Sequence, residues 1–282
     1  MQSGLISRLT SYGTGECVER KETMKKYELT QNIKKIGNIT LHQIKALKDF
    51  RDVKVGELGG YIEKENNLSQ EGNAWVYGNA LVYDNARVFG DAEVSGDAEV
   101  YDNARAFGDA EVYGDARVFG DATVFGDAEV HDNARVFGDA EVYSDAEVSG
   151  DADVYDNARV YGDARVFGDA EVYDNARVFG DARVFGDATV FGDAEVYGDA
   201  RVFGDAEVYS INHILTIEPI GSRNGTTTFY RNKDNKISVV CGCFNGSIEE
   251  FVAAVKNTHG DNNHAKAYEL AVELAKLQID LS

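Results

Sequence analysis

The segment GNAWVYGNALVYDNARVFGDAEVS, residues 72–95, opens a run of hexapeptides that decides the fold. Twenty-three such units follow one another without insertion from Gly72 to Tyr209, and each reads roughly Gly/Asp-Asp/Asn-Ala-x-Val-Phe/Tyr. A short, strict period is typical of a solenoid, in which each unit buries its apolar face only by stacking on its neighbours. The repeat therefore predicts the architecture of about half the chain.

Polarity alternates within each hexapeptide. Ala at the third position and Val at the fifth flank a variable and mostly charged residue, and a period of two is strand patterning. We expect Ala and Val to point inward, and the fourth and sixth positions to point outward. Gly, Asp and Asn at the first two positions tolerate the backbone that a sharp corner needs. Each hexapeptide is thus predicted to form one short strand and one corner.

The spacing of aliphatic and small residues resembles that of the hexapeptide-repeat family of left-handed β-helices. In that family a small residue follows an aliphatic one by four positions, as Ala92 follows Val88 and Ala98 follows Val94. The resemblance implies three hexapeptides per coil, a left-handed winding, and stacking of residues that are 18 apart. The predicted fold is mainly β, a left-handed parallel β-helix of about 7.7 coils and roughly 37 Å in length. Ala106 stands where neighbouring levels have Val, so we expect a small void there.

The flanking segments predict separate units. We expect residues 1–23 to be a disordered leader and residues 24–71 to be an N-terminal cap, with strands in KKYELT and ITLHQIKAL. Residues 213–282 predict a C-terminal α+β module with strands in HILTIEPIG, TTTFYRN and KISVVCGCF and with helices over 247–258 and 264–280. Caps are expected because the open end of a β-helix exposes unpaired backbone.

Four short stretches of the cap resemble bacterial hexapeptide-repeat proteins regarded as acyltransferases, and also phage and prophage proteins. They are Ala46–Phe50, Asp52–Lys54, Gly59–Gly60 and Leu68–Gln70. The resemblance implies a phage or prophage origin, with acyl transfer as an alternative function. Three cysteines, no long apolar run and no signal-type N-terminus favour a cytoplasmic protein, in the host cell if phage encoded, without membrane association.

The negative charge of the chain is concentrated in the repeat. Residues 72–209 contain 31 acidic residues and 9 arginines, which gives −22, while the whole chain carries −21. This charge opposes direct nucleic-acid binding and favours a basic protein partner. Over the predicted rod it amounts to about one charge per 1.7 Å, as in duplex DNA. We therefore expect a non-catalytic acidic rod, and nucleic-acid mimicry against a host defence protein is its sharper form.

One outward column is acidic and then basic when every eighteenth residue is stacked. Its members are Trp75, Glu93, Glu111, Glu129, Glu147, Arg165, Arg183 and Arg201. The adjacent sixth positions include Ser95, His131 and Ser149 where other columns have Phe or Tyr. We predict that the four glutamates and His131 form a partner-binding surface. Duplication of an 18-residue unit would produce the same column without selection.

Three further sets of residues have both a functional and a structural interpretation. His131 is the single histidine of the repeat, and the family's enzymes use histidine as a general base, but no loop interrupts the coils to form a pocket. Cys241 and Cys243 are expected to be core residues rather than metal ligands, and no metal or cofactor is predicted. An aspartate ladder on one corner could gather cations, although turn formation is the favoured role. The ladder is Asp91, Asp109, Asp127, Asp145, Asp163, Asp181 and Asp199.

Aromatic residues occupy twenty of the 23 sixth positions. We expect them to stack along the rod, since cross-strand aromatic pairs stabilise sheets. Exposed aromatic ladders, or the C-terminal module, could also join copies of the chain into a homo-oligomer. A structural spacer or polymer subunit is thus a third interpretation.

Overall fold

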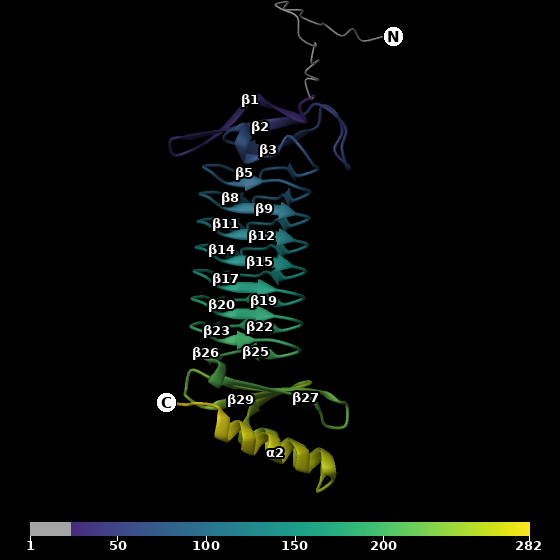
Figure 1. Cartoon of the computed structure of the whole chain (residues 1–282), viewed down its shortest axis with the longest axis vertical. Coiled ribbons are helices and arrows are strands. Elements are labelled where there is room, and N and C mark those ends of the chain that lie inside the picture. Colours follow the sequence, from purple (N-terminus) through teal and green to yellow (C-terminus); the bar gives the residue numbers. More distant parts are fainter. Residues whose placement is uncertain (1–23) are drawn as a thin grey trace, which may run out of the picture.

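Stacked coils of 18 residues form the rod of the computed structural model, which describes residues 24–282 (Figure 1). Val94 pairs with Val112, and Val112 with Val130, in parallel register. The three-hexapeptide coil and the parallel β-helix are therefore confirmed. The leader expected over residues 1–23 lies outside the described residues.

Three sheets form the sides of the rod. The first contains β1 (Tyr27–Ile36), β2 (Ile39–Ala46), β3 (Leu58–Ile62), β5 (Leu81–Val82), β8 (Glu99–Val100), β11 (Arg117–Val118), β14 (Arg135–Val136), β17 (Asp153–Val154), β20 (Glu171–Val172), β23 (Thr189–Val190) and β26 (Glu207–Val208). The second contains β4 (Trp75–Val76), β7 (Glu93–Val94), β10 (Glu111–Val112), β13 (Glu129–Val130), β16 (Glu147–Val148), β19 (Arg165–Gly168), β22 (Arg183–Gly186) and β25 (Arg201–Phe203). The third contains β6 (Arg87–Val88), β9 (Arg105–Gly108), β12 (Thr123–Gly126), β15 (Glu141–Ser144), β18 (Arg159–Tyr161), β21 (Arg177–Phe179) and β24 (Glu195–Val196).

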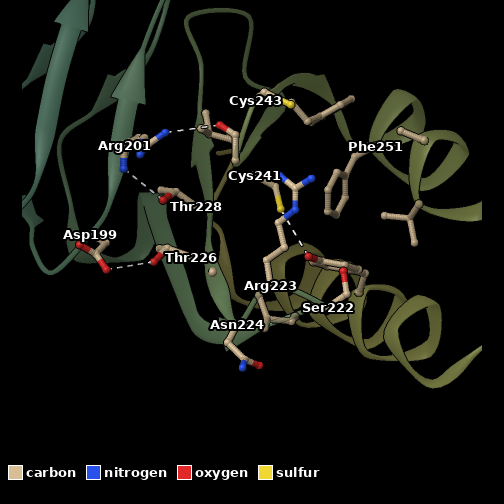
Figure 2. A pocket seen from close by; sticks show the side chains of 18 of the residues that line it. Asp199, Arg201, Ser222, Arg223, Asn224, Thr226, Thr228, Cys241, Cys243 and Phe251 are labelled. Carbon is tan, nitrogen blue, oxygen red and sulfur yellow. Dashed lines mark hydrogen bonds between the residues drawn. The ribbon is translucent and has the colours of Figure 1, made fainter. Parts of the chain in front are cut away.

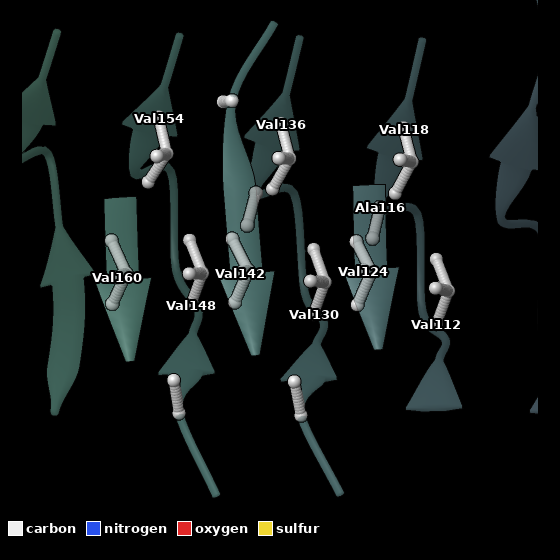
Figure 3. Packing of buried hydrophobic residues seen from close by; sticks show 14 of the residues in the cluster. Val112, Ala116, Val118, Val124, Val130, Val136, Val142, Val148, Val154 and Val160 are labelled. Atoms are coloured by element: carbon white, nitrogen blue, oxygen red, sulfur yellow. The ribbon is translucent and has the colours of Figure 1, made fainter. Parts of the chain in front are cut away.

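Alanine and valine columns fill the interior of the rod. Every third-position Ala and fifth-position Val from Ala74 to Val208 is at most 2% exposed. Figure 3 shows valines of all three sides, among them Val112, Val118 and Val124, directed toward the common axis. Val88, Ala106 and Val124 stack in one column, as predicted.

The corners require a left-handed backbone at their first residue. Gly108 has φ +76°, and a Cβ there would lie 2.9 Å from the backbone nitrogen of Gly126 in the next coil. Aspartate takes the same conformation where the corner reads Asp-Asn, as at Asp102 with φ +56°. Its Oδ2 accepts a hydrogen bond from Gly120 N at 3.3 Å. Such corner carboxylates therefore bond the next coil rather than their own turn.

The first coil begins before the hexapeptide run. Tyr61 of β3 pairs in parallel with Leu81, and Leu68 pairs with Val88, so these residues are 20 rather than 18 apart. The short 3-10 helix Glu65–Asn67 lies between them. Large aliphatic residues replace Val in this coil, which conceals it from the repeat pattern.

The N-terminal cap closes one end of the rod. The two strands predicted in the cap, β1 and β2, pair antiparallel around Gly37. Lys26 is fully buried, and its Nζ donates a hydrogen bond to Ala74 O at 2.7 Å, so it satisfies a carbonyl group of the first complete coil. Trp75 is also fully buried, against the ring edges of Tyr27 and Phe50. The expectation that Trp75 points into solvent is wrong, because the cap covers it.

The C-terminal module is an antiparallel sheet with two helices, at the opposite end of the rod (Figure 1). The expected third strand is divided at Gly242, φ +59°, into a hairpin. Ser247 and Glu250 form a capping box at the start of α1, where a helix is predicted. The module follows the 3-10 helix Ile211–His213. It consists of β27 (Ile214–Ile220), β28 (Gly225–Arg231), β29 (Ile237–Cys241), β30 (Phe244–Ser247), α1 (Ile248–His259) and α2 (Asn263–Gln278).

Strand β28 closes the last coil. Within the rod Arg183 N donates to Ala200 O of the next coil, and at the end of the rod Arg201 N donates to Thr228 Oγ1 at 3.1 Å instead. The Tyr230 hydroxyl donates to Phe203 O at 3.0 Å. The module thus replaces the missing next coil. Within residues 24–282, no helix combines the length and apolar character that crossing a membrane requires.

Candidate functional site

The predicted acidic column exists in the second sheet. Glu93, Glu111, Glu129 and Glu147 pair successively in register, and Arg165 continues the column. Glu111 and Glu129 are exposed, while Glu93 and Glu147 are half-buried. Like charges one strand apart repel, so the column has an electrostatic cost that its surroundings must offset.

Arginines close both ends of this column. Arg51 from the cap forms an ion pair with Glu93, and Arg165 Nε lies 3.4 Å from Glu147 Oε2. Burial raises the pKa of Glu93, Arg51 opposes this shift, and Glu111 adds to it. The repeat gives no sign of Arg51, because that contact joins the cap to the rod.

Ring side chains hold several of the glutamates. The Tyr113 hydroxyl donates to Glu129 Oε2 at 2.9 Å, and the Tyr83 hydroxyl donates to Glu99 Oε2 at 3.0 Å. In each pair the glutamate follows the tyrosine by 16 residues. It therefore lies in the next coil, two positions before the residue that stacks directly on the tyrosine. A spacing of 16 between Tyr and Glu is a signal for this contact that the sequence contains and that the column pattern alone does not reveal.

His131 occupies the ring position of the same motif. It stacks on Tyr113 with centroids 4.7 Å apart and planes at 6°, and its Nε2 lies 3.2 Å from Glu147 Oε1. Its Nδ1 lies 3.3 Å from Asp132 Oδ2. Both ring nitrogens therefore face carboxylates, and the side chain is only 16% exposed. His131 also lies outside the three cavities found at the two ends of the rod.

Aspartates line the three edges of the rod. Of the 23 corners, 21 contain one Asp, and seven lie on each edge. The edges therefore carry a charge of −21, while the net charge of the rod is −22. The difference is small because the acidic residues and arginines on the three sides nearly cancel in charge. The predicted cation ladder, Asp91 to Asp199, is one of these edges. Within the described part of the chain, no three or more His, Cys, Asp or Glu side chains are placed to hold a metal ion.

Aromatic rings stack along the rod as predicted. One ladder runs unbroken from Tyr83 to Tyr209 and a second from Phe89 to Tyr197, with centroids 4.7–5.5 Å apart. The third is interrupted at Ser95 and at Ser149. Because the rings lie face to face, only their edges and the terminal faces contact solvent.

The two cysteines of the C-terminal module differ in environment. Cys241 on β29 is half-buried, whereas Cys243 in the hairpin turn is exposed, so the expectation of two core cysteines is wrong for Cys243. Thr227 Oγ1 donates to Cys241 Sγ at 3.1 Å, and the Tyr268 hydroxyl oxygen lies 3.6 Å from the same sulfur. Burial raises the pKa of Tyr268 to about 12.

A cavity of about 710 Å³ separates the basic end of the column from this module (Figure 2). Arg183 and Arg201 line it from the rod, and Arg223, Cys241 and Phe251 line it from the module. The sequence patterns give no sign of this site, since it forms only where two separately patterned units meet.

Comparison with known proteins identifies the repeat. Residues 158–170 match the family model described as YdcK Beta solenoid repeat. None of the curated proteins matches the chain. The matched residues cover β18, β19 and the corner between them, in the regular part of the rod. Together with the register of the coils, it supports a repeat architecture of the β-solenoid, or β-helix, type for the rod.

Proposed function

We propose that the protein is a non-catalytic rod that binds a basic protein partner through one acidic side. This side comprises the first four complete levels of the second sheet that follow Trp75, with the two edges that bound it. It carries three carboxylates per level. They are Asp91, Asp109, Asp127 and Asp145 on one edge, Glu93, Glu111, Glu129 and Glu147 on the strands, and Asp97, Asp115, Asp132 and Asp151 on the other edge.

The arrangement of these twelve carboxylates supports the proposal. Arg51 and Arg165 pair with the acidic side only at its two ends. The corresponding levels of the first sheet contain Arg117 and Arg135, and those of the third sheet contain Arg105. The acidic side is therefore the one extended surface of a single sign among the three, and such a surface attracts and orients a basic partner.

Nucleic-acid mimicry is the sharper form of this proposal. Successive coils place stacked rings such as Phe119 and Phe137 4.8 Å apart. Three carboxylates per coil then give about one charge per 1.6 Å of rod, against about 1.7 Å for duplex DNA. A phage or prophage protein that occupies a host DNA-binding or defence protein in the cytoplasm would need such a charge density.

Acyl transfer has less support in the described geometry. A general base must lie within hydrogen-bond reach of a bound substrate. Both nitrogens of His131 face carboxylates, and none of the three cavities adjoins it. The stacked rings and the two caps leave a spacer role compatible with the same rod, but they do not require one.

Capture of basic proteins from bacterial lysate tests the proposal. We expect the immobilised protein to retain basic proteins that elute with salt and are displaced by duplex DNA, because surface charges are screened within about 10 Å at 0.1 M salt. Changing the four column glutamates to Gln is expected to weaken binding of a purified captured protein about tenfold. Polyglutamate of equal charge controls for nonspecific attraction.

A matched variant separates the acidic side from total charge. Asp121, Asp139, Asp169 and Asp187 lie on corners outside the acidic side, and their change to Asn removes the same four charges. This control should retain binding. Equal weakening by both variants would show that only total charge matters, and full binding by the Gln variant would refute the acidic side as the contact.

A further inference from the structure

Three arginines from two parts of the fold line the cavity between the rod and the C-terminal module. Arg183 and Arg201 are adjacent in one column on β22 and β25, and Arg223 lies in the turn between β27 and β28. In Figure 2 the Arg223 side chain points from this turn toward the part of the cavity that contains Cys241. The site is unusual in a chain whose net charge is −21.

Within residues 24–282, none of these three guanidinium groups forms an ion pair with a carboxylate. The arginine ion pairs within residues 24–282 involve other arginines. Asp199 lines the same cavity without an ion pair to an arginine. Asp181 also lines the cavity without an ion pair to an arginine. Stacking Arg183 on Arg201 costs free energy that a bound anion would recover.

The wall opposite the arginines is apolar and aromatic. Phe251 and Val255 of α1 and Tyr268 of α2 are each less than 9% exposed, and all three line the cavity. Phe251 meets the rings of Phe244 and Tyr268 at centroid distances of 5.2 and 5.4 Å. These side chains thus present an apolar wall to the cavity, against which the ring of a ligand can lie.

Local backbone geometry fixes the Arg223 turn. Gly221, with φ +76°, opens the turn, and a Cβ there would lie 1.9 Å from the Tyr268 hydroxyl oxygen. Asn224 closes the turn with φ +49°, a conformation that Asn tolerates better than most residues. The turn is therefore held against α2, and the position of Arg223 depends on that contact.

We propose that this junction cavity binds a small aromatic anion. Its phosphate or carboxylate group is held by Arg183, Arg201 and Arg223, since guanidinium groups match the geometry of both oxyanions. Its ring packs on Phe251. A volume of about 710 Å³ accommodates such a ligand, because small-molecule pockets measure roughly 300–1,000 Å³.

Calorimetric titration with matched probes tests this site. The probes are 2-naphthyl phosphate and 2-naphthoate as anions, and 2-naphthol as the neutral analogue. We expect one site per chain and at least about tenfold tighter binding of an anion than of 2-naphthol, which is the value of one charge-assisted hydrogen bond. The two anions distinguish a phosphate from a carboxylate preference.

Two arginine variants locate the binding. Arg223→Gln is expected to remove the advantage of the anion and to leave 2-naphthol unchanged. Arg117→Gln removes the same charge from the first sheet, far from the cavity, and should leave all three affinities within about twofold. In a Cys17→Ser background, the anion should also slow labelling of Cys243 by N-ethylmaleimide.

Several results of these experiments would overturn the proposal. Absence of saturable binding by both anions overturns the proposal. So does an equal effect of Arg223→Gln and Arg117→Gln, or binding that leaves Cys243 labelling unchanged. None of these outcomes bears on the acidic side, which lies in the opposite half of the rod.

Discussion

Replacing Ala106 by Val should stabilise the rod. Ala106 is fully buried in an inward column whose neighbours on either side are Val88 and Val124. The coil has not closed the gap by compression along the axis, since Phe107 stacks 4.7 Å from Phe89 and 5.0 Å from Phe125, within the range of the other ladders. We therefore expect the two missing methyl groups to leave unfilled space that Val can occupy.

The expected gain follows from the buried apolar atoms. Each buried methylene is worth about 0.8 kcal/mol, so two carbon atoms give at most about 1.6 kcal/mol. Restriction of the valine side chain and imperfect fit reduce this to about 1 kcal/mol. For a domain of this size, that gain raises the thermal midpoint by about 2–4 °C.

Thermal and urea unfolding of matched variants measure this effect. Val124→Ala in the same column is the control, and it should cost about 2 kcal/mol through lost transfer free energy and a new cavity. A lower midpoint for Ala106→Val than for the parent would refute the reasoning. It would mean that the sides of the coil have drawn inward at Ala106, so that Val overpacks it.

Four further predictions follow from the caps, the column and the rings. Truncation after Tyr209 should cause end-to-end association, since Arg201 N loses its Thr228 partner and the last coil becomes an edge; a monodisperse monomer in light scattering would contradict the capping role. Changing the four column glutamates to Gln should not lower the thermal midpoint, because it removes like-charge stacking, and a fall of several degrees would show that the carboxylates stabilise the rod. Purified protein should not consume acetyl- or succinyl-CoA, and turnover that His131→Phe abolishes would restore the acyltransferase interpretation. Burial and the hydrogen bond to Glu129 raise the pKa of Tyr113 above its usual 10.0, so the stability it contributes is complete below pH 10 and is lost at higher pH; Tyr113→Phe should flatten this alkaline loss, and an unchanged pH profile would argue against it.

The regular part of the fold could be predicted because every level repeats the same local rules. The period of two assigned Ala and Val to the interior, and the period of 18 correctly placed Glu93 beside Glu111. The helix predicted over residues 247–258 likewise follows a local pattern, and Ser247 begins it with a capping box. In each case the contact follows from residues that are close in sequence or related by the repeat.

The contacts that were missed join differently patterned segments. Arg51 reaches Glu93 from the cap, and the cap buries Trp75, yet neither contact has a periodic signature. The junction cavity also depends on how β28 docks on the last coil. The hairpin at Gly242 was missed because a continuous apolar run reads as one strand unless its glycine is taken as a turn.

The edge charges exceed what the corners require for folding. A corner needs one residue that accepts a left-handed backbone and a polar neighbour, and Gly-Asn satisfies both requirements at Gly78–Asn79. Yet 21 of the 23 corners contain Asp, even though stacked carboxylates repel one another. Asparagine would preserve the turns without that repulsion, so the charge itself calls for an explanation outside folding. Retained stability after Asp→Asn changes along one edge, together with lost binding to a basic partner, would assign the aspartates to recognition, whereas unfolding would assign them to the corners.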